Sequence, residues 1–414
     1  MGSEKPAPTR FVGLDVHKFY LIAVFLDAEL NELCPPQRVQ LDHLQAWITG
    51  TLQPTDAVAL EMTTNTWEIH DALLPQVHSV TVVHPPHVAL ITRAQVITDK
   101  IAARCLARLL AKGLLVGIWV PPQAERDRRA LVAQRAKMVR LSTQAKNRLH
   151  SLLHRHAIPL PEKGNAFAPE LRQWWMGLPL TALEKGRVAC DLDTLTFARA
   201  QIGALEKLMV NVAAADDRVP LLIQLPGIAL VNALAILAAI GDISRFKEER
   251  HLVGYAGLGA RIHDSGLTTR TGRITKSGRR DLRAAMVEAA QTAANTHPRW
   301  KAELARLEPR LGRNKAIVAI ARKLLVGVWH VLTKQVADRH AEPARVARKL
   351  TQYAYRLGQA NRPLGQTAGA WVRTHLDRLG IGRELDAVPW GPGRKVPLPP
   401  STLPAPAQEG CAVA

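Results

Sequence analysis

Apolar and polar positions in the first quarter of the chain repeat with the periods of short strands and amphipathic helices. The expected strands cover residues 11–15, 20–25, 38–41, 57–61 and 80–83, and the expected helices cover 44–49, 66–74 and 98–112. A strand hairpin followed by alternating strands and helices is the order of a ribonuclease-H-like α/β domain. We therefore expect such a domain over residues 11–118, after a disordered N-terminus over 1–10.

A seven-residue apolar repeat marks the next segment and predicts long helices that pair as a coiled coil. One helix is expected over residues 123–157, and both stretches of the repeat fall in a helical arm over 119–215. The repeating positions are Leu131, Met138, Ala145 and Leu152 in the first stretch and Leu195, Ile202 and Met209 in the second. This spacing is compatible with pairing inside one chain or between two chains.

The remaining pattern predicts a mostly helical unit over residues 216–340 and a basic extension over 341–414. Hydrophobic residues make up 47% of the chain and aromatic residues only 5%, which favours helix-rich aliphatic cores over a β-sandwich. Proline is frequent near the C-terminus, from Val396-Pro-Leu-Pro-Pro to Pro406. Such a composition is typical of segments without a packed core, so we expect the end of the extension to be disordered.

The charge balance indicates the class of partner. The formal net charge is +20 and the isoelectric point is near 10.3, which makes a phosphate polyanion the expected ligand. We find no apolar run of about 18 residues and no signal peptide, so we expect a cytoplasmic protein without membrane contact. Four cysteines lie far apart without a CxxC pair, which argues against a zinc site or a disulfide framework.

Three carboxylates fall where a metal site would form in such a fold. Asp15 ends the first strand, Glu61 ends a later strand, and Asp99 opens the helix over 98–112. The first strand is central in a ribonuclease-H-like sheet, so Asp15 and Glu61 would share one cleft and the helix would add Asp99. Such oxygen ligands hold Mg²⁺, and two ions about 4 Å apart would stabilise the attacking and leaving oxygens of a phosphodiester. The alternative is that all three are solvated or capping acids, with Thr98 as the helix cap.

The segment Leu225-Pro226-Gly227-Ile228 precedes a helix that extends through Ala239 and is followed by Gly241. It resembles a helix–hairpin–helix turn, in which Gly227 would let the backbone approach phosphate at the helix N-terminus. A plain turn between two helices explains the same residues equally well.

A glycine-rich basic segment follows Tyr255 and contains Ser265. Its cations would surround phosphate oxygens, and they are Arg261, Arg270, Arg273, Lys276, Arg279 and Arg280. A serine that attacks phosphorus needs its developing charge neutralised, which these residues could do. The alternative is a basic loop in which Ser265 or Ser277 only donates hydrogen bonds to phosphate.

The helix over 123–157 carries charges of nearly one sign outside its apolar positions, among them Arg128, Arg135, Arg140, Lys146 and Arg148. Such a face repels itself unless a polyanion neutralises it, which favours contact with nucleic acid. The alternative is a solvated face of a coiled coil.

Several motifs in this order resemble the DEDD insertion-sequence transposases, which include the Piv-type DNA invertases and the bridge-RNA-guided recombinases. They are Phe11-Val-Gly-Leu-Asp15-Val-His17-Lys18, Leu60-Glu61-Met62-Thr63, Thr98-Asp99-Lys100-Ile101, the segment from Leu225-Pro226-Gly227 to Arg283, Asn314-Lys315-Ala316 and Ala321-Arg322-Lys323. The resemblance runs from about residue 11 to residue 335 and leaves the chain after about residue 340 uncovered.

This resemblance implies a RuvC-like domain, a coiled-coil arm and a C-terminal transposase domain. It also implies a homo-oligomer, a dimer that assembles to a tetramer, in which the acidic site of one subunit meets the serine of another. A structured guide RNA would pair with donor and target DNA. Carried over by position, Asp15, Glu61 and Asp99 match the first three acidic ligands, and Ser265 matches the nucleophile that forms a covalent phosphoserine link.

One position departs from the family pattern, which continues as Asp-x-x-Asp-Ala. Here the matching stretch is Asp99-Lys100-Ile101-Ala102-Ala103, so Ala102 stands where the fourth carboxylate belongs. Positions 99 and 102 are one helical turn apart and share a face. The resemblance therefore implies a metal site that lacks one ligand.

We thus expect an RNA-guided, Mg²⁺-dependent serine recombinase that cuts and rejoins DNA strands, with the 123–157 helix gripping RNA. One alternative is a Holliday-junction-type nuclease that uses the acidic site with water as its nucleophile. Another is a nucleic-acid-binding protein whose cleavage site is inactive because of Ala102.

Overall fold

A computed structural model of the chain describes residues 7–86, 98–161, 164–265 and 268–404, and for residues 262–271 it describes no side chains. The chain divides into two compact units, unit 1 (Met1–Pro122) and unit 2 (Gln123–Ala414). The N-terminal disorder expected for 1–10 falls largely outside the described residues, but Arg10 already belongs to the first strand. Nearly all of the three segments expected after residue 118 lies in unit 2.

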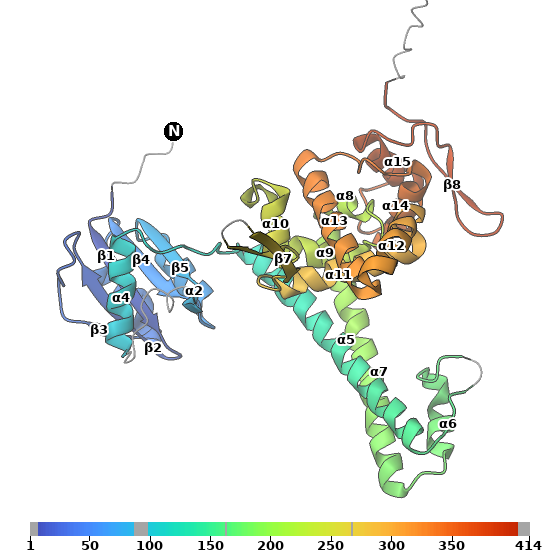
Figure 1. Ribbon diagram of the computed structural model, residues 1–414, viewed down its shortest axis with the longest axis horizontal. Coiled ribbons are helices and arrows are strands. Elements are labelled where there is room, and N and C mark those ends of the chain that lie inside the picture. The colour runs from blue at the N-terminus through green and yellow to red at the C-terminus, as the bar shows by residue number, and fades with distance from the viewer. Residues whose placement is uncertain (1–6, 87–97, 162–163, 266–267, 405–414) are drawn as a thin grey trace, which may run out of the picture. The chain divides into compact units, whose positions relative to one another are not determined.

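Unit 1 contains a five-stranded mixed sheet in the order β3-β2-β1-β4-β5 (Figure 1). Strands β1 to β3 pair antiparallel, whereas β4 is parallel to β1 and β5 is parallel to β4. The strands are β1 (Arg10–Val16), β2 (Tyr20–Leu26), β3 (Gln37–Gln40), β4 (Asp56–Glu61) and β5 (Ser79–Val83), and the helices include α1 (Leu44–Thr51), α2 (Thr66–Leu73) and α4 (Asp99–Ala111). The strands and helices predicted for this region are therefore confirmed, with ends shifted by one or two residues.

The sheet buries both faces, because successive side chains of a strand point to opposite sides. Leu14 and Leu60 belong to the core that α1 and α2 complete, whereas Ala59 packs with α4 on the opposite face. Leu14 pairs with Leu60 across β1 and β4. Asp15 and Glu61 follow these leucines directly, so they lie at adjacent strand ends on the face that α4 covers.

Gly13 sets the distance between α4 and β1. A Cβ atom at this position would lie 1.9 Å from the carbonyl oxygen of Ala103 and 2.6 Å from the amide nitrogen of Ala107. Only glycine lets the α4 backbone lie this close to the strand. Asp99, one turn before Ala103 on the same side of α4, is thereby held near the end of β1.

Gly13→Ala is expected to destabilise unit 1 by about 1–3 kcal/mol, the usual cost of forcing extra atoms into a packed core. Because α4 must shift away from β1, amide hydrogen exchange in the peptides of both elements should become faster. Gly50→Ala in α1 is the matched control, since a Cβ there meets nothing within 4 Å and alanine favours a helix. Equal exchange in the two variants would show that the close approach at Gly13 does not matter.

Unit 2 is mainly helical within its described residues and includes two β-hairpins (Figure 1). The first half contains α5 (Gln123–Arg155), α6 (Arg172–Gly177), α7 (Ala182–Ala214), α8 (Arg218–Ile223), α9 (Leu230–Ile240), α10 (Glu249–Tyr255), β6 (Ala260–Ser265) and β7 (Thr268–Ile274). The second half contains α11 (Arg280–Thr296), α12 (Pro298–Leu311), α13 (Arg313–Lys334), α14 (Pro343–Leu357), α15 (Ala368–Arg378), β8 (Ala387–Pro389) and β9 (Lys395–Pro397).

Helices α5 and α7 pair with each other inside the chain and form an arm that ends near α6 (Figure 1). Ion pairs join Arg135 to Glu206 and Arg148 to Asp191, so the partner number falls as the α5 number rises and the helices run antiparallel. The repeat positions Ala145, Leu152 and Leu195 lie in the buried core of this arm. The structure thus contains the first of the two pairings that the seven-residue spacing allowed.

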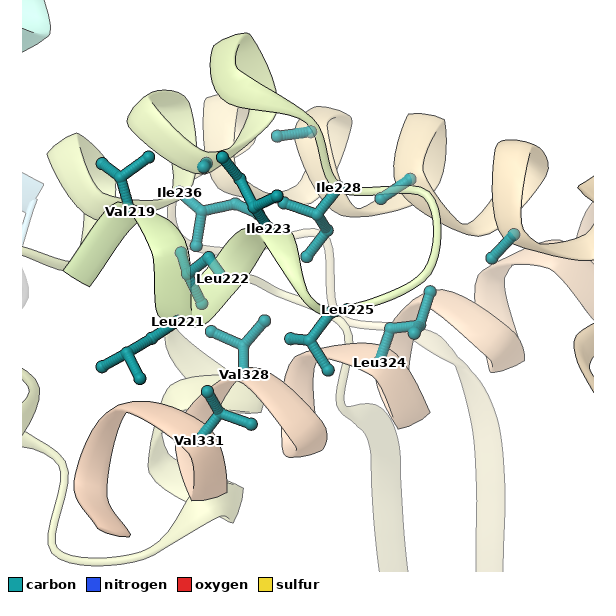
Figure 2. Close-up of a cluster of buried hydrophobic side chains, with 14 of the residues drawn as sticks. Val219, Leu221, Leu222, Ile223, Leu225, Ile228, Ile236, Leu324, Val328 and Val331 are labelled. Carbon is teal, nitrogen blue, oxygen red and sulfur yellow. The ribbon is translucent and has the colours of Figure 1, made fainter. Parts of the chain in front are cut away.

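The body of unit 2 is built around α13, and the turn between α8 and α9 packs against this helix. Figure 2 shows Leu225, from that turn, beside Leu324 and Val328 of α13. Helix α9 ends at Ile240, and Gly241 takes a positive φ of 65° directly after it, as expected of a glycine that terminates a helix.

Among the described helices, α13 is long and apolar enough to cross a membrane, as judged by its length and composition alone. Ile320, Leu324, Val328 and Val331 are instead buried in the core of unit 2. An apolar helix surrounded by other helices is what the centre of a globular body requires. The sequence shows no uninterrupted apolar run of this length. In α13 the apolar residues are interrupted by Arg322 and Lys323.

The proline-rich end of the extension packs against the body, and the disorder expected there is wrong for residues 396–404. Val396 and Leu398 are buried in the same core as α15. Arg373 of α15 is 4% exposed and donates hydrogen bonds of 2.8 Å to the carbonyl oxygens of Gly382 and Pro399. The prediction from composition was wrong for two reasons. Alternate apolar side chains of this segment are buried, and the segment is bound through its carbonyl oxygens, which proline retains although it lacks an N–H. Residues 405–414 lie outside the described chain.

Candidate functional site

The carboxylates of Asp15 and Asp99 come together at the end of β1. Single ligand atoms of Asp15, His17 and Asp99 all lie within 4.8 Å of one another. Thr98 caps α4 by accepting a hydrogen bond from the amide of Ile101 at 3.4 Å. The capping interpretation therefore holds for Thr98, while Asp99 turns toward the strand end. Two of the three predicted acids converge.

His17 and Tyr20 complete this cluster, and neither was predicted from the sequence as a ligand. The Nε2 atom of His17 lies 3.3 Å from Oδ2 of Asp15 and 3.3 Å from Oδ2 of Asp99. Tyr20 donates a hydrogen bond of 3.0 Å to Oδ2 of Asp99, and its ring stacks on His17. The available signal was spacing, because His17 follows Asp15 by two residues and so shares its side of the strand.

Partial burial raises the pKa values of two acids at this site. Burial raises the pKa of Asp15, the charge of Asp99 raises it further, and His17 lowers it. Burial also raises the pKa of Glu61, with a contribution from the charge of Asp15. Half-buried carboxylates with raised pKa values mark a place where a cation would be stabilised.

Glu61 lies at the neighbouring strand end but outside the group of three close ligand atoms. The charge of Asp15 raises the pKa of Glu61, while partial burial and then the charge of Glu61 raise the pKa of the half-buried Cys105 thiol. Glu61 therefore faces α4 between these two residues. The three predicted acids thus lie on the side of the sheet that α4 covers, at the ends of β1 and β4 and at the start of α4.

Ala102 is half-buried in the first turns of α4. It shares a helical face with Leu106 and Leu109, which pack on β4 and β5. A carboxylate at position 102 would therefore extend toward the strand end that carries Glu61. The alanine methyl leaves that side of the cluster without a ligand.

These residues fit a divalent cation. Carboxylate oxygens from Asp15 and Asp99, with Glu61 beside them, are the ligands that Mg²⁺ prefers. The imidazole of His17 would also suit a transition metal. The carboxylates of Asp15 and Asp99 both lie against His17. Burial and the charge of Asp99 raise the pKa of Asp15, and a bound cation would lower it.

Ser265 is the last residue of β6, in a β-hairpin, although the surrounding glycines had suggested a loop. Its backbone pairs with Thr268 of β7, and His263 pairs with Arg270. The predicted side chains of Ser265 and Arg270 lie outside the described part of the structure, as does Gly266. The backbone nevertheless puts Ser265 at the tip of the hairpin.

The base of this hairpin carries the remaining predicted phosphate ligands. Arg273, Lys276 and Arg280 are exposed and make no ion pair with a described residue. Arg261 donates to the carbonyl oxygen of Thr275 at 3.3 Å. Arg279 differs, because it forms an ion pair with Asp281 and is partly neutralised.

The glycines near these cations are required for packing. A Cβ at Gly227 would lie 1.9 Å from the carbonyl oxygen of Ala289, so this residue brings the α8–α9 turn onto α11. A Cβ at Gly278 would lie 2.3 Å from the carbonyl oxygen of Tyr255. Both also have positive φ angles, 76° and 102°. Close helix packing is a sufficient reason for Gly227, whether or not the turn also meets phosphate.

The predicted arm cations divide into two groups. Arg128 is 13% exposed and pairs with Glu125 and Asp216, while Arg135 and Arg148 pair with acids of α7. Lys146 lies 5.7 Å from the ring centre of Phe167, and Arg140 is exposed without an ion pair to a described residue. The argument that α5 must repel itself therefore overlooked the carboxylates of α7, which neutralise much of one side.

Exposed arm cations should carry any nucleic-acid contact. Changing Lys137, Arg140 and Arg155 to Gln is expected to weaken RNA binding and to lower the log–log salt slope by roughly two units, about 0.7–0.9 per lost phosphate contact. Arg135→Gln with Arg148→Gln should mainly lower the melting temperature, since Asp191 loses its partner and Glu206 keeps only Arg356. Filter binding at several salt concentrations measures the slope. A slope unchanged by the first variant would show that the arm makes no contact with nucleic acid.

Comparison with protein families gives two matches. A DEDD-type IS110 family model, described as a transposase, matches residues 12–158. A second model, described as the transposase IS116/IS110/IS902 family, matches residues 219–305. The matched ranges contain the acidic cluster and the β6–β7 hairpin, respectively.

Individual relatives agree with these matches. The chain is 27% identical over 248 residues to the transposase for insertion sequence element IS1111A of Coxiella burnetii, covering 58% of this chain and 68% of that protein. It is 27% identical over 216 residues to a probable family 20 transposase of Pseudomonas aeruginosa, covering 50% and 63%. It is 26% identical over 335 residues to the pilin gene-inverting protein of Moraxella bovis, covering 78% and 95%.

Proposed function

Because the chain belongs to the IS110-type transposase family, we propose that it is an RNA-guided recombinase that cuts and rejoins donor and target DNA. The observation that carries this proposal is the convergence of Asp15, His17 and Asp99 within 4.8 Å at the end of a central strand. A net charge of +20 supports a nucleic-acid substrate.

The fold of unit 1 supports a ribonuclease-H-like, RuvC-type nuclease domain. Its first strand is central, and the parallel strand β4 ends beside it with a second acid. Helix α4 adds the third acid across the same face. Catalytic carboxylates from two strands and one helix would thus surround one phosphodiester.

Asp15, Glu61 and Asp99 would hold the metal, with His17 and Tyr20 keeping the aspartates in position. Two bound Mg²⁺ ions would supply Lewis-acid stabilisation of the attacking and leaving oxygens. Ser265 would attack phosphorus through its hydroxyl oxygen, and a covalent phosphoserine would conserve the energy of the broken strand for rejoining. Arg261, Arg270, Arg273, Lys276 and Arg280 would neutralise phosphate charge around the hairpin.

Assembly and RNA belong to the same proposal. Ser265 of one subunit would act with the acidic cluster of another, in a dimer that associates to a tetramer. A structured guide RNA would contact the exposed cations of the arm, such as Arg140. Base pairing of that RNA with donor and target would select the sites of exchange.

A strand-transfer assay tests this function. Purified full-length protein, the non-coding RNA that flanks the gene, and donor and target plasmids are incubated with Mg²⁺, and the new junctions are amplified and sequenced. The protein with Ala102→Asp is run in parallel, because a site with only three acids should act slowly. Junctions that depend on both RNA and Mg²⁺ support the proposal.

The same assay separates the two alternatives. A Holliday-junction-type nuclease would cleave four-way DNA in Mg²⁺ without any protein–DNA adduct. A binding protein whose cleavage site is inactive because of Ala102 would give neither junctions nor cleavage, and only the Ala102→Asp protein would cleave DNA. Recombination that proceeds fully without RNA would refute the guiding role and leave a recombinase of the invertase kind.

A further inference from the structure

Unit 2 contains a cavity of about 560 Å³ that has no role in the recombinase function proposed above. It lies between the first turn of α12, one face of α13 and the segment that follows α13. This volume is within the range of roughly 300–1,000 Å³ typical of small-ligand sites. The cavity therefore has room for a group the size of a nucleotide.

The rim of the cavity is cationic and largely unneutralised. Arg299, Lys334 and Arg339 line it, are exposed, and make no ion pair with a described residue. Lys323 also lines it but pairs with Glu303. Among the described lining residues the single acid is Asp338, whose carboxylate already accepts the amide of His340 at 3.1 Å. Three exposed cations around one cavity favour an anionic ligand.

The inside of the cavity is apolar but contains two unsatisfied nitrogens. Leu225 and Leu324, which lie side by side in Figure 2, form part of its wall. His330 and His340 also line it, and the Nδ1 atom of the first and the Nε2 atom of the second are buried without a hydrogen-bond partner among the described residues. Buried polar atoms of this kind cost free energy unless a partner arrives.

The cavity wall is held in place. Gln224 is 4% exposed, accepts the amide of Asp338 at 2.9 Å and donates to the carbonyl oxygen of Val336 at 3.2 Å. These bonds fix the segment that carries Arg339 and His340 against α8. A site formed in advance loses less entropy on binding than one that must be ordered by its ligand.

We propose that this cavity binds one unpaired nucleotide, with its phosphate on Arg299, Lys334 and Arg339. The base and sugar would lie on the apolar wall, and the free nitrogens of His330 and His340 would hydrogen-bond to the base edge. The nucleotide comes either from an unpaired segment of a nucleic-acid strand or from a free mononucleotide. This site goes beyond the proposed recombinase, because it needs neither the acidic cluster nor Ser265.

The test compares two charge-matched variants of the full-length protein in binding a labelled unpaired oligonucleotide. The rim variant changes Arg299, Lys334 and Arg339 to Gln. The control changes Lys301, Lys315 and Arg322 to Gln, which removes the same charge from α12 and α13 outside the cavity lining. The rim variant should lose at least about tenfold in affinity and roughly 0.7 units of salt slope, the share of one neutralised phosphate, well beyond the control. Equal losses would mean general surface attraction and overturn the proposal.

A second variant fills the cavity without changing charge. A Cβ at Gly327 would lie 3.7 Å from Oδ1 of Asp338 and 3.9 Å from Leu225, so Gly327→Leu directs its side chain at the cavity wall while Gly327→Ala fits. With folding checked by circular dichroism, the leucine variant should lose affinity as the rim variant does and the alanine variant should not. If Gly327→Leu does not fold, His330→Phe, which removes the free nitrogen, takes its place. Normal binding by the cavity-filling variant would refute the site.

Competition identifies the source of the nucleotide. A mononucleotide that displaces the oligonucleotide from the wild-type protein, and not from the rim variant, would indicate a free nucleotide as a ligand. Displacement by unlabelled oligonucleotide alone would indicate a strand segment. Inorganic phosphate that competes as well as the mononucleotide would overturn the assignment of base and sugar to the apolar wall. Because binding is measured without cleavage, these outcomes do not depend on recombinase activity.

Discussion

Replacing Ser265 with alanine is expected to abolish covalent attachment of DNA to the protein. If the Ser265 hydroxyl oxygen forms the bond to phosphorus, its removal leaves no protein atom to take over the strand. Labelled DNA incubated with Mg²⁺ and RNA, then run on a denaturing gel, should show no slowly migrating adduct. Binding of RNA and DNA should persist, because the exposed cations Arg273, Lys276 and Arg280 remain.

Ser277→Ala is the matched control for this experiment. Ser277 lies in the same basic segment and is exposed, but it falls after the hairpin. Adduct should form normally in this variant. If Ser277→Ala loses the adduct and Ser265→Ala keeps it, the nucleophile is Ser277 and not Ser265. Cleavage without an adduct in every protein would favour a nuclease that uses water.

Replacing Ala102 with aspartate is expected to raise covalent adduct formation by roughly tenfold or more, on the order of one catalytic electrostatic group. Position 102 lies on the α4 face that covers β4, so a carboxylate there would approach Glu61. Four carboxylates would balance the charge of two divalent ions better than three do. The half-buried acids would also gain a cation that relieves their mutual repulsion.

Two further measurements make this result specific. Ala102→Asn adds an oxygen of similar size without charge, so it should give clearly less adduct than Ala102→Asp. Direct titration of Mn²⁺ by electron paramagnetic resonance should show tighter binding only for the aspartate variant. Equal adduct and equal metal affinity in all three proteins would mean that position 102 is not a ligand position and that three acids suffice.

Tertiary structure decided the composition of the acidic cluster beyond its predicted acids. Tyr20 reaches Asp99 across 79 positions of sequence, through the β1–β2 hairpin and the packing of α4 on Gly13. His17 bridges two carboxylates that no local spacing connects. Local patterns carry no information about such distances, because they depend on how separate elements pack.

Tertiary structure also determined which cations of the arm remain unpaired. The predicted cations Arg135 and Arg148 are paired by α7, whose acids lie 71 and 43 residues further along the chain. A count of charges on α5 alone suggested a surface that only a polyanion could neutralise. Pairing inside the chain changed that balance and left residues such as Arg140 as the exposed ones.

The sequence by itself determined the elements of unit 1, the helical arm and the positions of Asp15, Glu61 and Asp99, because strand and helix periods and strand ends are local properties. It did not determine the fate of Val396 and Leu398, since burial in a shared core depends on residues far away in the chain. The composition of that segment indicates that it cannot form a core by itself. It does not exclude that the segment packs against the core of the rest of unit 2. The free energy that orders it comes from Arg373 and the core it joins, and only the folded chain brings these together.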